Sequence, residues 1–73
     1  MKGYVIAVQQ AGASVGILKK GNKVLLFSTE DKAREYAREE VEGNVFMMIG
    51  WNVSPCSNWT NEIKESGGIK QMG

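Results

Sequence analysis

Short apolar runs, separated by glycine and polar residues, occupy the first third of the chain. Residues Tyr4–Gln9 are mostly β-branched or apolar and predict a first strand. Two further apolar runs, Val15–Lys19 and Lys23–Phe27, flank Gly21-Asn22. A Gly-Asn pair between two apolar runs is typical of a β-hairpin with a two-residue turn. The chain therefore begins with three predicted strands.

The two-residue turn also predicts which hairpin side chains share a face, because side chains alternate along a strand. One face would carry Leu18, Leu25 and Phe27. The other face would carry Val15, Ile17, Val24 and Leu26. Both faces of the hairpin are thus apolar away from its tip.

A main helix is predicted over residues 29–42. Ser28 is the expected N-cap, and Asp31 stands three residues later, as in a capping box. The apolar residues of the segment recur at helical spacing and form one narrow stripe: Ala33, Tyr36, Ala37 and Val41. Gly43 is the expected left-handed residue that ends the helix.

The run VFMMI at residues 45–49 is uninterrupted by polar residues and predicts a central strand buried on both faces. The order of elements is then β-β-β-α-β, with the helix crossing over between the third and fourth strands. The predicted fold class is α+β, a single small domain with a four-stranded sheet and one main helix.

The C-terminal part gives weaker signals. A short helix over residues 61–65 is expected to start at an N-cap, Asn58 or Thr60, and to end before Gly67. We predict that the domain spans residues 1–66 and that residues 67–73 form a flexible tail.

The predicted sheet carries apolar side chains on both faces, so both faces must be buried by other parts of the structure. The main helix covers one face, and the short C-terminal helix can cover part of the other. An exposed apolar patch of roughly several hundred Å² usually marks an interface. We therefore expect a homo-oligomer, most simply a two-fold dimer.

Composition argues against several kinds of chemistry. The 73 residues include one cysteine and no histidine. Cys56 therefore lacks the histidine base that thiol catalysis usually needs. Carboxylates and one thiolate are also a poor ligand set for zinc. We expect no enzymatic activity, no cofactor and no bound metal.

Charge and hydropathy favour a cytoplasmic protein. No apolar stretch approaches the ~20 residues of a membrane-spanning helix, and the N-terminal apolar run is too short for a signal peptide. A single thiol suits a reducing compartment. Nine basic and eight acidic residues nearly cancel, so a general attraction to nucleic acid is not expected.

The segment GWNVSPCSNWT, residues 50–60, contains both tryptophans of the chain, its only proline and its only cysteine. Tryptophan offers a large rigid contact area, and asparagine offers adaptable hydrogen bonds. We predict a binding loop here. Its candidate contact residues, together with one aromatic residue of the first strand, are Trp51, Asn52, Asn58, Trp59 and Tyr4. The alternative is that the two tryptophans close the ends of a small core.

Basic side chains suggest a second candidate site, for anions. Lys19, Lys20 and Lys23 make the hairpin tip basic, and Arg34 and Arg38 lie on the predicted helix. Such groups can hold phosphate or carboxylate through charge-assisted hydrogen bonds. Lysines at a hairpin tip are also ordinary solubilising residues that protect strand edges.

In the segment KVLLFSTEDKAREYAREEVEGNVFMMIGW, Phe27-Ser28-Thr29 is followed by Ala33, Tyr36 and Ala37. This order of a strand, a Ser/Thr-capped helix with Ala-x-x-Tyr-Ala and a closing strand resembles small bacteriophage-encoded accessory proteins, of the host-takeover or anti-defence type. The resemblance implies a setting. Such proteins often bind a host or defence component, either a protein or a nucleotide signal, without catalysis.

Three functions are compatible with these patterns. The first is a small non-catalytic interaction protein that binds and blocks or modulates a macromolecular partner, such as a host protein. The second is an oligomer that sequesters a small anionic, nucleotide-like ligand between subunits. The third is a nucleic-acid-binding module, for which binding should depend steeply on salt.

Overall fold

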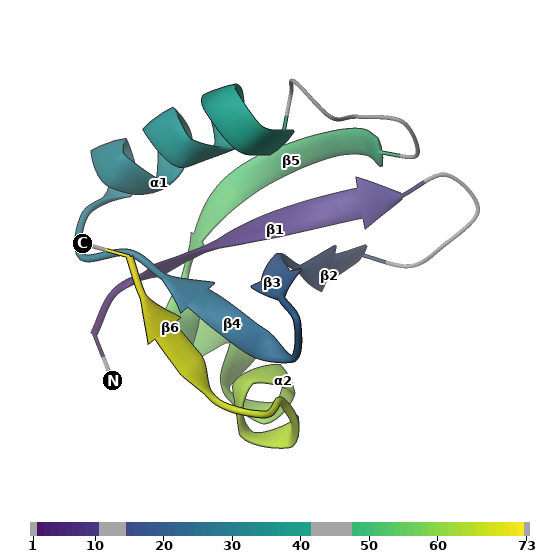
Figure 1. Ribbon diagram of the computed structural model, residues 1–73, viewed down its shortest axis with the longest axis vertical. Coiled ribbons are helices and arrows are strands. Elements are labelled where there is room, and N and C mark those ends of the chain that lie inside the picture. The colour runs from purple at the N-terminus through teal and green to yellow at the C-terminus, as the bar shows by residue number, and fades with distance from the viewer. Residues whose placement is uncertain (1, 11–14, 42–47, 73) are drawn as a thin grey trace.

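The computed structural model describes residues 2–10, 15–41 and 48–72. In chain order its elements are β1 (Tyr4–Gln10), β2 (Val15–Ile17), β3 (Lys19–Lys20), β4 (Lys23–Leu26), α1 (Glu30–Tyr36), the π-helix η1 (Ala37–Val41), β5 (Met48–Pro55), the 3-10 helix η3 (Cys56–Trp59), α2 (Thr60–Glu65) and β6 (Ile69–Gln71). The predicted helix end at Gly43 and most of the predicted strand over residues 45–49 lie outside the described residues. Figure 1 shows α1 above β1 and β4, and α2 below them.

The strands form two three-stranded sheets, with the orders β2-β1-β5 and β3-β4-β6. Leu18 is the corner between them, because its N–H donates to the Ile6 carbonyl (2.8 Å) and its carbonyl accepts from the Leu25 N–H (3.4 Å). A second link joins β1 to the end of β4, where Tyr4 and Phe27 exchange two backbone hydrogen bonds of 2.8 and 2.9 Å. The sheets are therefore connected at two points.

The predicted α+β class is confirmed, but the strand arrangement differs from a single four-stranded sheet. Both edges of β1 are occupied, by β2 on one side and β5 on the other, and both pairings are antiparallel. β4 can consequently reach β1 only at Tyr4. β5 does not pair with β4, whose parallel neighbour is instead β6.

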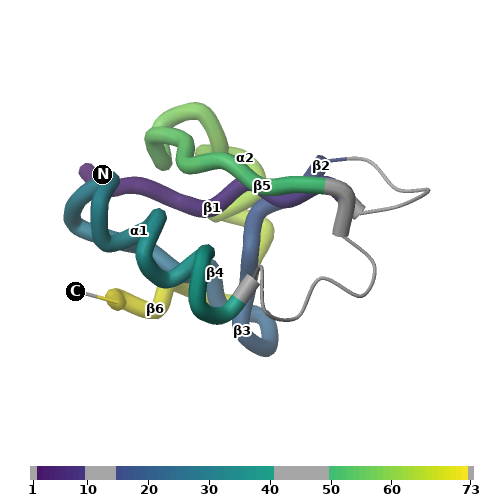
Figure 2. Tube along the Cα trace, turned by 90° about the horizontal axis from the view of Figure 1, so that it is seen from above, coloured from purple at the N-terminus to yellow at the C-terminus, as the bar shows by residue number. Residues whose placement is uncertain are grey.

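Side chains that alternate along β1 and β4 supply two cores, one on each face. The first core consists of Ile6, Val8, Leu25, Phe27, Ala33 and Ala37. The second core consists of Val5, Ile17, Val24, Leu26, Cys56 and Ile63. The predicted faces of the hairpin are confirmed, except that Val15 is 50% exposed instead of buried with the second face. Figure 2, seen from above, shows α1 and α2 on opposite sides of β1.

The main helix forms as predicted, but its N-cap is Thr29 and not Ser28. Thr29 has an extended backbone (φ −133°, ψ 156°), and its Oγ1 accepts a hydrogen bond from the Lys32 N–H at 3.2 Å. The helix continues without a break into η1, which the structure describes as far as Val41.

The predicted short C-terminal helix is present as α2, but neither predicted N-cap caps it. The N-cap position is held by Trp59, without a side-chain cap. The Asn58 amide donates to Ser54 Oγ at 3.4 Å, and Thr60 Oγ1 donates to the Ser57 carbonyl at 3.1 Å. The preceding 3-10 turn leads directly into the helix and leaves no extended residue to act as a cap.

The second face of the strands is covered by the chain itself. Cys56 and Ile63, from η3 and α2, are 2% and 7% exposed. Trp59 and Ile69 are half-buried and pack against the same core. The homodimer was expected because an apolar face of the sheet would otherwise be exposed. Since this face is covered within the chain, that argument for a homodimer no longer holds.

The tail expected for residues 67–73 is instead packed against the domain as far as Met72. β6 pairs in parallel with β4, with Val24 opposite Ile69 and Leu26 opposite Gln71. The Met72 N–H donates to the Leu26 carbonyl at 2.8 Å. The radius of gyration, 11.2 Å, equals the ~11 Å typical of a compact domain of this length. The two glycines before Ile69 turn the chain back onto β4 and do not release it.

Candidate functional site

The predicted binding loop over residues 50–60 is mostly regular structure. It comprises the last six residues of β5, all of η3 and the start of α2. Trp51 lies opposite Val8 and packs against the first core, whereas Trp59 packs against the second core. The two tryptophans are therefore on different faces of the domain.

The other predicted contact residues divide in the same way. Tyr4 packs against the first core. Asn52 is exposed and lies opposite Ala7, two positions from Val5 of the second core, so it shares that side with Asn58. Ser54 Oγ accepts from the Trp59 indole N–H at 3.2 Å and from the Asn58 amide. The structure does not bring these five residues together, and it uses the Trp59 polar group internally.

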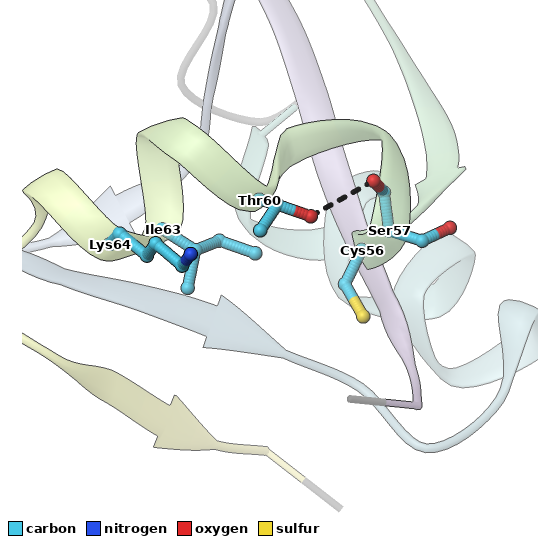
Figure 3. Close-up of a pocket in the computed structure, with 5 residues that line it drawn as sticks. All are labelled: Cys56, Ser57, Thr60, Ile63 and Lys64. Carbon is cyan, nitrogen blue, oxygen red and sulfur yellow. Dashed lines mark hydrogen bonds between the residues drawn. The ribbon is translucent and has the colours of Figure 1, made fainter.

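A hollow of about 260 Å³ lies beside η3 and α2, and Figure 3 shows the side chains that line it. Cys56 and Ile63 are buried there, and the exposed Ser57, Thr60 and Lys64 complete the lining. The Thr60 hydroxyl already donates to the Ser57 carbonyl. The lining contains no carboxylate that could act as a base, and the Cys56 thiol is 2% exposed. This hollow is mainly a gap over the second core.

Four exposed lysines gather where β3, β4 and β6 meet, and we call them the lysine patch: Lys19, Lys20, Lys23 and Lys70. Lys20 lies directly opposite Lys23 in the antiparallel pair. Lys70 lies opposite Leu25 in the parallel pair, two positions along β4 from Lys23. Lys19 lies opposite Val24, so its side chain leaves from the other face.

The register gives the spacing of the three lysines that share a face. Directly opposed Cβ atoms are about 5 Å apart in antiparallel pairs, which applies to Lys20 and Lys23. From a strand separation of about 4.8 Å and a rise of about 3.3 Å per residue, Lys70 begins about 8 Å from Lys23. Among the described residues, none of the three forms an ion pair with a carboxylate. They form a short row of positive charge across three strands.

The C-terminal segment holds this row in place. The Gly67 N–H donates to the Asn22 carbonyl at 2.7 Å, and the Val24 N–H donates to the Gly68 carbonyl at 2.9 Å. The Ser66 hydroxyl lies 2.6 Å from the Ile63 carbonyl and accepts from the Gly68 N–H at 3.3 Å. The end of α2 is thereby tied to the hairpin turn, and the turn has a defined position.

The predicted arginines do not belong to the lysine patch. Arg34 forms an ion pair with Glu30 on the surface of α1, at 2.5 Å. Arg38 is exposed on η1, the continuation of α1. Figure 1 places α1 at the top of the view and the β3–β4 turn in its lower half. The five predicted anion contacts thus form two separate groups.

Sequence reasoning missed Lys70 and Ser66, because both were placed at or beyond the end of the domain. The sequence carries little signal for the strand, because Lys70 and Gln71 after Ile69 are both polar and break any apolar-polar alternation. Three residues after two glycines are also too few to predict a strand. Ser66 gives no signal, since its role depends on the turn that it stabilises.

In the described part of the chain, the helices are too short and too polar to span a membrane. No group of three or more cysteine, aspartate or glutamate side chains in the described ranges is arranged to hold a metal ion. The lysine patch is therefore the strongest candidate for a functional surface.

Comparison of the chain with protein-family models, with curated proteins and with solved structures finds no match. The function has to be inferred from the side chains and their arrangement.

Proposed function

We propose that this protein is a small non-catalytic interaction domain that binds an acidic surface of a partner protein through its lysine patch and blocks that surface. The β3–β4 hairpin and β6 present the patch, and backbone hydrogen bonds of Gly67 and Gly68 tie the C-terminal segment to the hairpin. The resemblance to phage accessory proteins and a cytoplasmic location are part of this proposal. Cys56, the single cysteine of the sequence, is buried, and a lone thiol suits a reducing compartment.

The observation that carries the proposal is the placement of Lys20 directly opposite Lys23. Like charges in this position destabilise a strand pair. An acidic partner would offset the repulsion, and Lys70 adds a third positive charge on the same face. Rows of one sign of charge also speed the encounter with a surface of opposite charge.

Charge is unevenly distributed over the whole chain, and this favours a protein partner. Residues 30–42 contain six acidic and three basic residues, whereas the rest of the chain contains two acidic and six basic residues. A compact acidic surface can contact the patch without approaching the acidic helix. A long polyanion such as duplex DNA would need a broader basic surface, since tight binders neutralise about 6–10 phosphates.

The two other functions receive less support from the geometry. Small ligands bind in concave sites, whereas the lysines of the patch line neither the hollow beside η3 and α2 nor the one beside α1. Single-stranded nucleic acid binds by stacking on aromatic side chains. The tyrosines and tryptophans of the described residues are half-buried against the two cores.

The test is a binding assay with three probes: fluorescent poly-L-glutamate as an acidic polypeptide, a duplex DNA of about 20 base pairs, and ATP. The variant Lys20→Glu/Lys23→Glu is compared with Lys2→Glu/Lys64→Glu, which changes the net charge equally at exposed positions outside the patch. We expect the first variant to weaken poly-L-glutamate binding by about tenfold or more. The control should remain within about twofold of the original protein.

Equal losses in both variants would show that net charge, not the patch, attracts the probe, and would overturn the proposal. Tight duplex binding with a steep salt dependence would favour the nucleic-acid function instead. Saturable ATP binding that persists at high salt would favour the small-ligand function.

A further inference from the structure

We propose that the lysine patch also has a docking site on a second copy of this chain. The site is a hollow of about 230 Å³ beside α1, and we call it the acidic hollow. It is lined by Phe27, Lys32, Glu35, Tyr36, Glu39 and Met72. The pairing would be antiparallel and two-fold, with the patch of each copy in the hollow of the other. It adds a second surface, the acidic hollow, and does not depend on whether the patch binds a foreign partner.

The floor and rim of the acidic hollow suit a lysine side chain. Phe27 is buried, and Tyr36 and Met72 are half-buried, so the floor is apolar. The Phe27 and Tyr36 rings have centroids 5.4 Å apart and are inclined at 51°. Lysine can lay its methylene stem on such a floor while its ammonium group stays at the rim. A volume of about 230 Å³ is below the ~300 Å³ at which pockets for small ligands begin.

The charges at the rim favour a cation. Glu35 and Glu39 stand four positions apart on the helix and line the same hollow. Like charges at this spacing destabilise a helix, and among the described residues neither carboxylate has an ion-pair partner. Lys32 is the one basic side chain in the lining, so one unit of negative charge remains uncompensated.

Each end of the molecule therefore holds an unfavourable pair of like charges, and the two pairs have opposite sign. Lys20 faces Lys23 at the hairpin, and Glu35 neighbours Glu39 at the helix. Docking one onto the other would offset both repulsions at once. A second copy supplies the required cations as the exposed lysines of its β3–β4 hairpin.

The positions of the two surfaces suit a closed pair. Figure 1 places α1 at the top of the longest axis and the hairpin turn in the lower half. Two copies side by side in opposite directions would bring each patch beside the other copy's hollow. Such a contact is isologous and closes on itself. It would also hide the lysine patch, so an acidic partner would compete with self-association.

The experiment measures self-association by sedimentation and native mass spectrometry, using the full chain. Lys20→Glu/Lys23→Glu makes both surfaces of a copy acidic, and Glu35→Lys/Glu39→Lys makes both surfaces basic. Each variant alone should be monomeric. An equimolar mixture should form a heterodimer, because every patch then meets a hollow of opposite charge. Recovery in the mixture also shows that both variants are folded.

The original chain should dimerise at about 50 mM salt. Its dimerisation affinity should fall by about tenfold or more at about 500 mM salt, because salt screens the charges. The control Glu62→Lys/Glu65→Lys, on α2, should behave like the original chain.

Three results would overturn the inference. The original chain could be monomeric under all conditions, or it could form dimers that neither variant affects. Binding of poly-L-lysine to the hollow of a monomeric chain would indicate a foreign basic partner instead. The variant Glu35→Lys/Glu39→Lys keeps the lysine patch, so its binding to poly-L-glutamate tests the proposed function separately.

Discussion

Gly3 shows how one residue controls the junction between the two sheets. It precedes Tyr4, whose backbone is bonded to Phe27, and its own carbonyl accepts a hydrogen bond from the Cys56 N–H at 3.0 Å. Its φ of +136° lies in a region that favours glycine. A Cβ atom at this position would lie 2.9 Å from the Phe27 carbonyl oxygen and 2.9 Å from Leu26 Cδ1.

Replacement of Gly3 by alanine should therefore lower the free energy of unfolding by about 1–3 kcal/mol, through backbone strain and contact with a backbone oxygen. Chemical denaturation of the purified variant measures the loss. Gly16→Ala is the matched control, since a Cβ there would have no neighbour within 4 Å. Equal stability of the two variants would contradict the strain expected for an alanine at position 3.

Some residue roles could be predicted from the sequence and others could not. The Gly21-Asn22 turn and the lysines beside it follow from a local signal, and the structure confirms the turn. The separation of Trp51 from Trp59 could not be predicted, because it depends on where β5 ends and η3 begins. Lys70 could not be assigned to the patch before β6 was known to pair with β4.

At the scale of elements, the helix signals were strong because they are local. Ala33 and Ala37 recur on one stripe and are both fully buried. Adjacent Ser28 and Thr29 can each act as an N-cap, so the sequence could not decide between them. The choice depends on the path of the chain after Phe27, which the bridge to Tyr4 determines.

Thr29→Ala should lower the free energy of unfolding by about 1 kcal/mol, the usual effect of losing an N-cap hydrogen bond. Ser28→Ala is the control and should change it by less than about 0.5 kcal/mol, because Ser28 is exposed outside the helix. Thermal unfolding followed by circular dichroism measures both. A larger loss of unfolding free energy in the Ser28 variant would show that Ser28 is the N-cap, as expected from the sequence.

Strand pairing was harder to predict than strand existence. The runs in β1 and β4 have the β-branched, apolar character expected of strands buried on both faces. Pairing between β1 and β5, or between β4 and β6, joins residues far apart in the chain, and no local signal specifies such partners. The division of the predicted second strand into β2 and β3 also depends on distant residues, because Leu18 is hydrogen-bonded to Ile6 in one sheet and to Leu25 in the other.

For the molecule as a whole, the two cores share β1 and β4. Val5 and Ile6 are neighbours in the chain but lie in different cores, and the same is true of Val24 and Leu25. One core cannot lose its packing without displacing strands that support the other. The domain is therefore expected to unfold in a single cooperative transition.

The tryptophans provide a direct test, since Trp51 reports on the first core and Trp59 on the second. Trp51→Phe leaves Trp59 as the single fluorescent reporter, and Trp59→Phe leaves Trp51. Adding Ile63→Ala to each of these two variants should shift the unfolding midpoint by the same amount. Loss of a buried isoleucine should cost about 2–5 kcal/mol. A shift seen by Trp59 fluorescence but not by Trp51 fluorescence would mean that the cores unfold separately.

The parallel pairing of β4 with β6 has a consequence for synthesis of the protein on the ribosome. The Gln71 side chain lies 3.5 Å from the Leu26 carbonyl, 45 positions earlier in the chain. At about 5–20 residues per second, roughly 2–9 s separate the translation of these two residues. Throughout that interval β4 lacks its parallel neighbour. The native pairing of β4 can therefore be completed only after β6 has been translated.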